Sequence, residues 1–126
     1  MTQSSMVDDT INWLEKSDKA IMDIVDPIMD NLIQASSDSD HERHVRDFSD
    51  QLKAIVTEDN FREQCKGYQE TLGFFSKREL VGIFRKEKNV RVFWRQWYTK
   101  SQDEFVAYIA VWKHGNNIEV IDVSVS

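Results

Sequence analysis

Apolar and polar positions alternate in four short runs over the last third of the chain. Each run is rich in β-branched and aromatic residues and ends at turn-forming residues, which is typical of β-strands. The connections between the runs are too short for a parallel crossover, so the pattern predicts a four-stranded antiparallel meander. We expect its strands over residues 80–86, 90–99, 104–113 and 118–125.

The expected strand over 104–113 is apolar on both of its faces, because odd and even positions from Phe105 to Trp112 are both apolar. A sheet with one face in water should instead alternate apolar and polar residues. One face of the sheet should therefore meet helices. The other should meet a partner subunit, a ligand or the sheet itself where it curves strongly.

Apolar residues at steps of three and four predict a helix that begins near residues 8–10. Its apolar stripe runs from Ile11 and Leu14 to Ala35, and only Asp18 interrupts it. We interpret this stripe as packing on the protein's own sheet, with an oligomerisation helix as the alternative.

Pro27 lies inside that helical pattern and removes a backbone donor. We expect the helix to kink or break there, with a change of direction near Asp26. The sequence therefore predicts an N-terminal helical arm over residues 1–25, which belongs to the same domain, and an α+β domain over residues 26–126.

Two further helices are expected after a loop of capping residues at 36–40. The first has Val45, Phe48, Leu52 and Ile55 as its buried positions, although Ser49-Asp50 can break it.

The next helix should begin at Thr57 as its cap and end near Gly73. Its apolar face is formed by Phe61, Cys65, Tyr68 and Leu72. Three helices followed by four antiparallel strands predict an α+β fold, with the helices packed on one face of the sheet.

Several of these residues form a pattern that resembles a known family. They are Asp40, His44, Phe48, Leu52, Thr57-Glu58-Asp59-Asn60-Phe61, Leu72-Gly73 and Ser76-Lys77-Arg78-Glu79-Leu80-Val81-Gly82. The pattern is similar to small cystatin-like domains of the nuclear-transport-factor-2-like superfold, over roughly residues 28 to 125. The resemblance implies a strongly curved sheet around helices, often with a cone-shaped cavity and often dimeric through the sheet. It assigns no function, because the superfold hosts isomerases, dehydratases, binding modules and assembly domains.

The composition indicates a globular protein of ordinary hydrophobicity, with a net charge of −6. Residues 1–76 have a net charge of −9 and residues 77–126 of +3, as expected for acidic helices that cover a mildly basic sheet.

Cys65 is the single cysteine, so no internal disulfide forms. The N-terminus lacks the pattern of a signal peptide, and no apolar run reaches membrane-spanning length, so we expect a cytoplasmic protein without membrane contact.

Candidate chemical residues are few. His41 and His44 lie three apart on an expected helix, but nothing at a suitable spacing completes a metal site, so we expect no metal and no cofactor. Cys65 lies on an apolar helix face and is interpreted as a buried thiol rather than a nucleophile.

A pocket enzyme of isomerase or dehydratase type would need a carboxylate or histidine with a perturbed pKa inside the cavity. Asp103, Asp122 and Tyr108 are the sheet residues able to act in this way. Asp122 is the most suggestive, because alternation along its strand places it on one face with Val120 and Ser124. The alternative is a polar sheet edge or cavity rim.

The segment 91–98 interleaves arginine with aromatic residues, as in proteins that bind single-stranded nucleic acid. The acidity of the whole chain argues against this function, and the alternative is pairing of the arginines with Glu104 or Glu119 across the sheet.

Three of the four tryptophans lie in the expected sheet, and aromatic enrichment is typical of interface cores and ligand pockets. We therefore favour a homodimeric interaction module or small-molecule-binding module without catalysis, which dimerises through its sheet. The candidate residues for the pocket or the dimer interface are Trp94, Trp97, Tyr108, Trp112 and Asp122.

Overall fold

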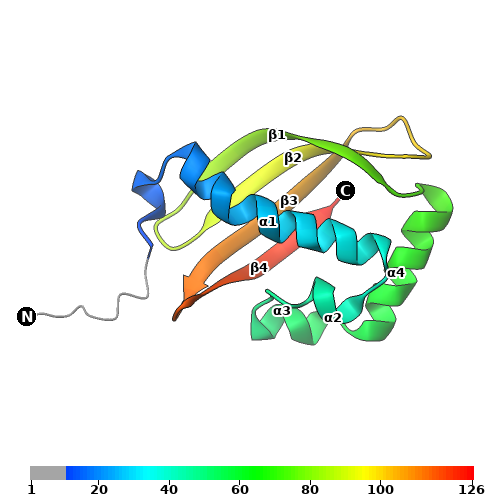
Figure 1. Ribbon diagram of the computed structural model, residues 1–126, viewed down its shortest axis with the longest axis horizontal. Helices are drawn as coiled ribbons and strands as arrows, with labels where there is room; N and C mark the ends of the chain where they lie inside the picture. The colour runs from blue at the N-terminus through cyan, green and yellow to red at the C-terminus, as the bar shows by residue number, and fades with distance from the viewer. Residues whose placement is uncertain (1–10) are drawn as a thin grey trace, which may run out of the picture.

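The computed structural model describes residues 11–126, in which helices precede a single four-stranded sheet (Figure 1). The helix start expected at residues 8–10 lies outside the described residues. The helical elements are a 3-10 helix η2 (Trp13–Glu15), α1 (Asp18–Ser37), α2 (His41–His44), α3 (Asp50–Ile55) and α4 (Glu58–Thr71). The strands are β1 (Phe75–Arg85), β2 (Val90–Tyr98), β3 (Phe105–His114) and β4 (Asn117–Val125). The α+β class expected from the sequence is confirmed.

The strands pair in the order β1-β2-β3-β4, and every pair is antiparallel, as the short connections predicted. Strand β1 begins at Phe75, earlier than expected, because its first residues pair with the end of β2. The register shifts within β1 and again in β4 beside Ile121. Such bulges bend a strand and increase its twist, which helps the sheet to curve around the helices.

Side-chain caps decide where the helices begin. Each cap is a serine, threonine or aspartate whose side-chain oxygen accepts a hydrogen bond from a backbone N–H three residues later, which satisfies one of the free donors of the first turn. These caps are Ser17 for α1, Asp40 for α2, Ser49 for α3 and Thr57 for α4.

Helix α1 differs from the sequence prediction at both its start and its proline. It begins at Asp18 after the Ser17 cap, so Asp18 does not interrupt a longer helix. The preceding η2 turn buries Trp13 and leaves Leu14 exposed, the reverse of the predicted stripe. Helix α1 continues through Pro27 to Ser37 as one element, so, of the kink or break expected there, the break is wrong.

The segment between α2 and α3 pairs with the sheet. Phe48 forms an isolated parallel bridge with Val120, in which the Ser49 N–H donates to the Val120 carbonyl at 2.9 Å and the Val120 N–H donates to the Asp47 carbonyl at 2.7 Å. This pairing buries Phe48 and ends one helix before the next begins. Because α3 is a separate helix and does not continue α2, Ile55, which was expected to be buried, is 69% exposed.

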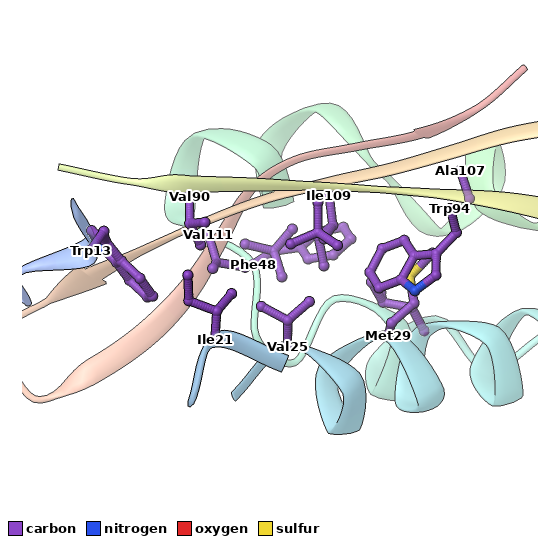
Figure 2. Packing of buried hydrophobic residues seen from close by; sticks show 13 residues of the cluster. Trp13, Ile21, Val25, Met29, Phe48, Val90, Trp94, Ala107, Ile109 and Val111 are labelled. Carbon is purple, nitrogen blue, oxygen red and sulfur yellow. The ribbon is translucent and has the colours of Figure 1, made fainter. Parts of the chain in front are cut away.

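The core lies between α1 and the inner face of the sheet (Figure 2). Ile21, Val25 and Met29 of α1 point toward valines of β2 and β3 and toward Trp94, while Trp13 closes one end. Burial of each large apolar side chain contributes about 1.5–3 kcal/mol, so this layer stabilises the fold. We define the inner face by Val90, Val92, Trp94, Gln96, Ala107, Ile109, Val111 and Val120.

Two arginines of β1 attach the edge of the sheet to α1. Arg78 donates to Asp26 at 3.1 Å and to Asp30 at 2.9 Å, and its guanidinium lies over the Trp94 ring. Arg85 pairs with Asp18 and donates to the Lys16 carbonyl. The acidic helical layer therefore meets basic residues of the sheet, as the charge distribution indicated.

The opposite face of the sheet is left partly exposed in the described part of the chain. Phe84 packs edge-on against Phe93, which contacts Tyr108, and Phe84 remains 57% exposed. We define the outer face by Phe84, Arg91, Phe93, Arg95, Trp97, Val106, Tyr108, Trp112 and Asp122. Within residues 11–126, no helix is both long and apolar enough to cross a lipid bilayer.

Candidate functional site

A cavity of about 250 Å³ lies between the C-terminal half of α1, helix α4 and the C-terminal ends of β2 and β4. Apolar side chains form most of its wall, among them Met29, Leu32, Phe61 and Val123. None of the described residues that line it is an aspartate, glutamate, lysine or arginine. The cavity is therefore an uncharged space with a few polar groups, which is the usual composition of a small-molecule site.

His44 is one of these polar groups, at the end of α2. The Asp40 cap fixes this turn, and the imidazole packs 4.4 Å from the Phe61 ring and edge-on to Phe48 at 5.3 Å, measured between ring centroids. Burial, and to a smaller extent the nearby His41, lowers the pKa of His44 to about 4. The imidazole is consequently neutral at pH 7, and its Nδ1 is buried without a hydrogen-bond partner.

Gln96 and Tyr98 are the polar groups contributed by β2. The alternation of the strand places Gln96 on the inner face, where the side chain is only 2% exposed. Its Nε2 donates to the Tyr98 hydroxyl at 3.1 Å, whereas its Oε1 is buried without a partner. Burial raises the pKa of Tyr98, so the phenol keeps its proton at neutral pH.

Helix α4 supplies further polar lining, and the rest comes from serines of α1 and β4. These residues are Gln64, Cys65, Tyr68 and Gln69 of α4, Ser36 and Ser37 of α1 and Ser124 of β4. Cys65 is buried, and burial raises the pKa of its thiol, with a hydrogen bond from Ser39 as a smaller opposing effect. A protonated thiol is a poor nucleophile, so the interpretation of Cys65 as a buried thiol agrees with its surroundings. Tyr68 stacks near Tyr98 and, together with the exposed Phe74, marks the solvent side of the cavity.

The predicted site residues divide between the two faces of the sheet. Trp94 is 2% exposed and belongs to the core on the inner face, beside Met29 (Figure 2). Trp97, Tyr108 and Trp112 lie on the outer face, where Lys77 covers the Trp97 ring at 4.5 Å and Trp112 Nε1 donates to Glu119 at 3.1 Å. None of these four rings lines the cavity.

Asp122 also lies on the outer face, exposed to solvent. The sequence predicted that it shares a face with Val120, and this is wrong because the bulge beside Ile121 reverses the alternation. Val120 is fully buried on the inner face, while Asp122 pairs opposite Ala110 on the outer face. Asp103 lies in the exposed loop between β2 and β3, away from the cavity lining.

The arginines of the segment 91–98 have acidic or polar partners on the sheet. Arg95 pairs with Glu104 at 2.9 Å and approaches Glu79 at 3.7 Å, which agrees with cross-strand pairing. Arg91 donates to Asn89 at 3.4 Å.

The two histidines of α2 both lie near Phe61 but have different polar surroundings. His41 Nε2 is 2.8 Å from the Val56 carbonyl, whereas His44 packs between Phe48 and Phe61. Among residues 11–126, no group of three or more histidine, cysteine or acidic side chains is arranged to hold a metal ion.

Sequence reasoning missed the polar lining of the cavity. Gln96 and Tyr98 were not among the predicted residues, and His44 was considered only as a metal ligand. A signal for Gln96 existed, because it has the same parity as Val90, Val92 and Trp94 and is the single polar residue in that apolar series. A polar residue on the buried face of a strand is a candidate for a site.

No protein-family model and no curated protein matches the sequence. Among solved structures, a SEC-C motif containing protein from Rhodopseudomonas palustris is similar, with a TM-score of 0.54, 14% identity and coverage of 90% of this chain and 98% of that one. The protein Bd1075 from Bdellovibrio bacteriovorus is similar with a TM-score of 0.52 and 16% identity. The match covers 82% of this chain but only 39% of the length of Bd1075. Both likenesses concern the fold alone.

A protein from Novosphingobium aromaticivorans, provisionally named a scytalone dehydratase, has a TM-score of 0.47 at 14% identity and covers 85% of this chain and 83% of its own. This likeness is too low to bear on the function of the chain.

Proposed function

We propose that the protein is a small-molecule-binding module whose ligand occupies the cavity between α1, α4 and the sheet. The observation that supports this function most strongly is a pair of buried polar atoms without partners, His44 Nδ1 and Gln96 Oε1, on residues that line an uncharged cavity. A buried polar atom without a partner destabilises a protein by about 1–3 kcal/mol. A ligand that supplies the missing hydrogen bonds recovers part of this free energy.

Catalysis of isomerase or dehydratase type is the second candidate function, and His44 is the observation in its favour. A neutral imidazole inside a cavity can accept a proton. Its pKa of about 4 nevertheless makes it a weak base at pH 7, because an effective general base has a pKa near the working pH. No carboxylate from the described residues lines the cavity to assist it, so binding is the better supported function.

Methionine methyl NMR tests the binding function, because α1 provides an internal control. Met29 lines the cavity, whereas Met22 lies on the same helix outside it. Propylbenzene is a suitable probe, since a cavity of about 150 Å³ already accepts benzene. We expect propylbenzene to shift the methyl resonance of Met29 in a saturable way and to leave that of Met22 nearly unchanged.

A cavity-filling variant completes this test. Cys65→Phe should abolish the Met29 response, while Ile55→Phe on the exposed side of α3 should preserve it. Equal shifts at Met29 and Met22, or a response that survives Cys65→Phe in a folded protein, would contradict a ligand in the cavity.

We also propose that two copies associate through the outer face. Phe84 and Val106 are at least half exposed there, and such an apolar surface is typical of an interface. Arg91, Ala110 and Asp122 lie in one cross-strand row, with the small Ala110 between the two charges. Rotation of a second copy by 180° about an axis near Ala110 would place each Asp122 against the partner's Arg91, so the face is complementary to itself.

Charge reversal tests the homodimer by sedimentation velocity. Arg91→Asp or Asp122→Arg alone places like charges together and should weaken the dimer by at least about tenfold. The double variant restores opposite charges and should recover the association. A monomeric wild-type protein, or a double variant no better than the single variants, would overturn this arrangement.

A further inference from the structure

The lining of the cavity restricts the chemistry of its ligand. We propose that the ligand is an uncharged, largely apolar molecule with one hydroxyl group, and that the carboxamide of Gln96 binds this hydroxyl. The inference rests on the proposed binding function and adds the class of ligand to it.

Ligand charge is restricted by the absence of any charged partner. The lining contains no acidic or basic side chain among the described residues, and the one titratable imidazole, that of His44, is held neutral by burial. The phenol of Tyr98 and the thiol of Cys65 stay protonated for the same reason. A carboxylate or ammonium group in this space would lose its hydration without gaining an ion pair, so charged ligands should be rejected.

Gln96 determines the polar group of the ligand. Its carboxamide is buried, shares one hydrogen bond with the Tyr98 hydroxyl and retains an oxygen without a partner. Gln96 is one of the residues that line the cavity, so its carboxamide is within reach of a ligand there. Beyond their mutual hydrogen bond, the amide keeps its oxygen as an acceptor and the phenol keeps its O–H as a donor. A hydroxyl group satisfies both because it donates and accepts.

Ligand size follows from the volume. The cavity of about 250 Å³ exceeds the roughly 150 Å³ that holds one benzene, so a single ring with a short alkyl chain fits. The aromatic side chains of Phe61, Tyr68 and Phe75 along the wall favour such a ring.

A series of four probes of similar shape tests the inference on the 126-residue chain. The probes are propylbenzene, 4-propylphenol, 4-propylanisole, in which a methyl ether replaces the hydroxyl, and 4-propylbenzoate. Affinities come from titration of the Met29 methyl resonance, and the side-chain NH₂ resonances of Gln96 report the contact itself. We expect 4-propylphenol to bind about tenfold more tightly than 4-propylanisole, to shift the Gln96 resonances, and 4-propylbenzoate not to bind.

Two variants assign the preference to the Gln96–Tyr98 pair. Gln96→Met keeps the length of the side chain but removes the amide, so it should bind the phenol and the ether about equally. Tyr98→Phe removes only the hydroxyl and preserves the ring, so it should reduce the preference for 4-propylphenol over 4-propylanisole. This variant provides the test if Gln96→Met does not fold.

Each other outcome is decisive. Equal binding of propylbenzene and 4-propylphenol would overturn the hydroxyl assignment and leave the binding function standing. A preference for 4-propylphenol that persists in both folded variants would overturn the assignment of Gln96 and Tyr98 and would also leave the binding function standing. Tightest binding of 4-propylbenzoate would overturn the restriction to uncharged ligands. A series in which no probe shifts Met29 would overturn the inference and the proposed binding function together.

Discussion

His44 lies between the rings of Phe48 and Phe61, with one ring nitrogen buried and unpaired. Its pKa, about 4, is set mainly by burial, and His41 adds a smaller effect of the same sign. The unfolded chain, in contrast, binds this proton with the ordinary pKa of 6.5. The residue therefore links the stability of the fold to pH.

This linkage predicts a loss of stability in mild acid. Between pH 6.5 and pH 4 the unfolded state binds the proton and the folded state does not. With respect to His44, the free energy of unfolding is therefore greatest above pH 6.5 and decreases as the pH falls toward 4. Urea unfolding should show that the wild type loses about 2 kcal/mol more than His44→Gln between pH 7 and pH 4.5.

The comparison with His44→Gln removes the contribution of carboxylates, because both proteins share them. Parallel losses of stability in the two proteins would show that His44 is not buried in its neutral form.

At the scale of the element, helix α4 has one glycine in its interior and another just past its C-terminal end, and the two are in opposite situations. Gly67 lies in the helix interior, where an added Cβ would meet no atom of another part of the chain within 4 Å. Gly73 follows the helix end with a φ of +82°, where a Cβ would meet Thr99 Oγ1 at 2.1 Å. That oxygen accepts a hydrogen bond from the Phe74 N–H at 3.0 Å, so it is not free to move aside. Gly73 thus turns the chain from α4 into β1 beside the cavity.

Alanine substitution should separate these two roles. Gly67→Ala adds helix propensity and should stabilise the protein by about 0.5–1 kcal/mol. Gly73→Ala forces a side chain into a left-handed conformation and a steric clash, and should destabilise it by about 2 kcal/mol or more. Thermal unfolding of both variants checks the prediction, and a Gly73→Ala protein as stable as the wild type would refute the assigned turn.

At the scale of the whole molecule, the two faces of the sheet differ in what they contact. The inner face meets α1 and the cavity, whereas the outer face keeps exposed aromatic residues. Trp94 and Trp97 are only three residues apart in β2, yet they belong to different faces because strand side chains alternate. The alternation makes them a matched pair for testing the architecture.

Glutamate substitutions should affect this pair differently. Trp94→Glu buries a carboxylate in the core and leaves a large void, so it should destabilise the protein by about 4 kcal/mol or more and prevent folding. Trp97→Glu changes the outer face and should leave the circular dichroism spectrum of the monomer intact. If Trp94→Glu folded as well as Trp97→Glu, the assignment of the inner face would be wrong.

The class of the fold follows from local physics and was predictable. Short turns restrict neighbouring strands to antiparallel pairing, and runs of apolar residues in steps of two or of three and four fix the type of each element. Thr57 and Gly73 were recognised as the ends of α4 because their cap chemistry is local. The start of α1 at Ser17 was missed because an apolar stripe continues across it.

Tertiary structure alone decided which residues meet. The bulge beside Ile121 reversed the face of Asp122, and the bridge from Phe48 to Val120 reoriented α3. The cavity combines His44 of α2 with Gln96 of β2, which are more than fifty positions apart in the chain. The sequence by itself determined the elements, because hydrophobic periodicity and caps act over a few residues. The cavity and its polar lining required the packed fold, because register and burial depend on contacts between distant segments.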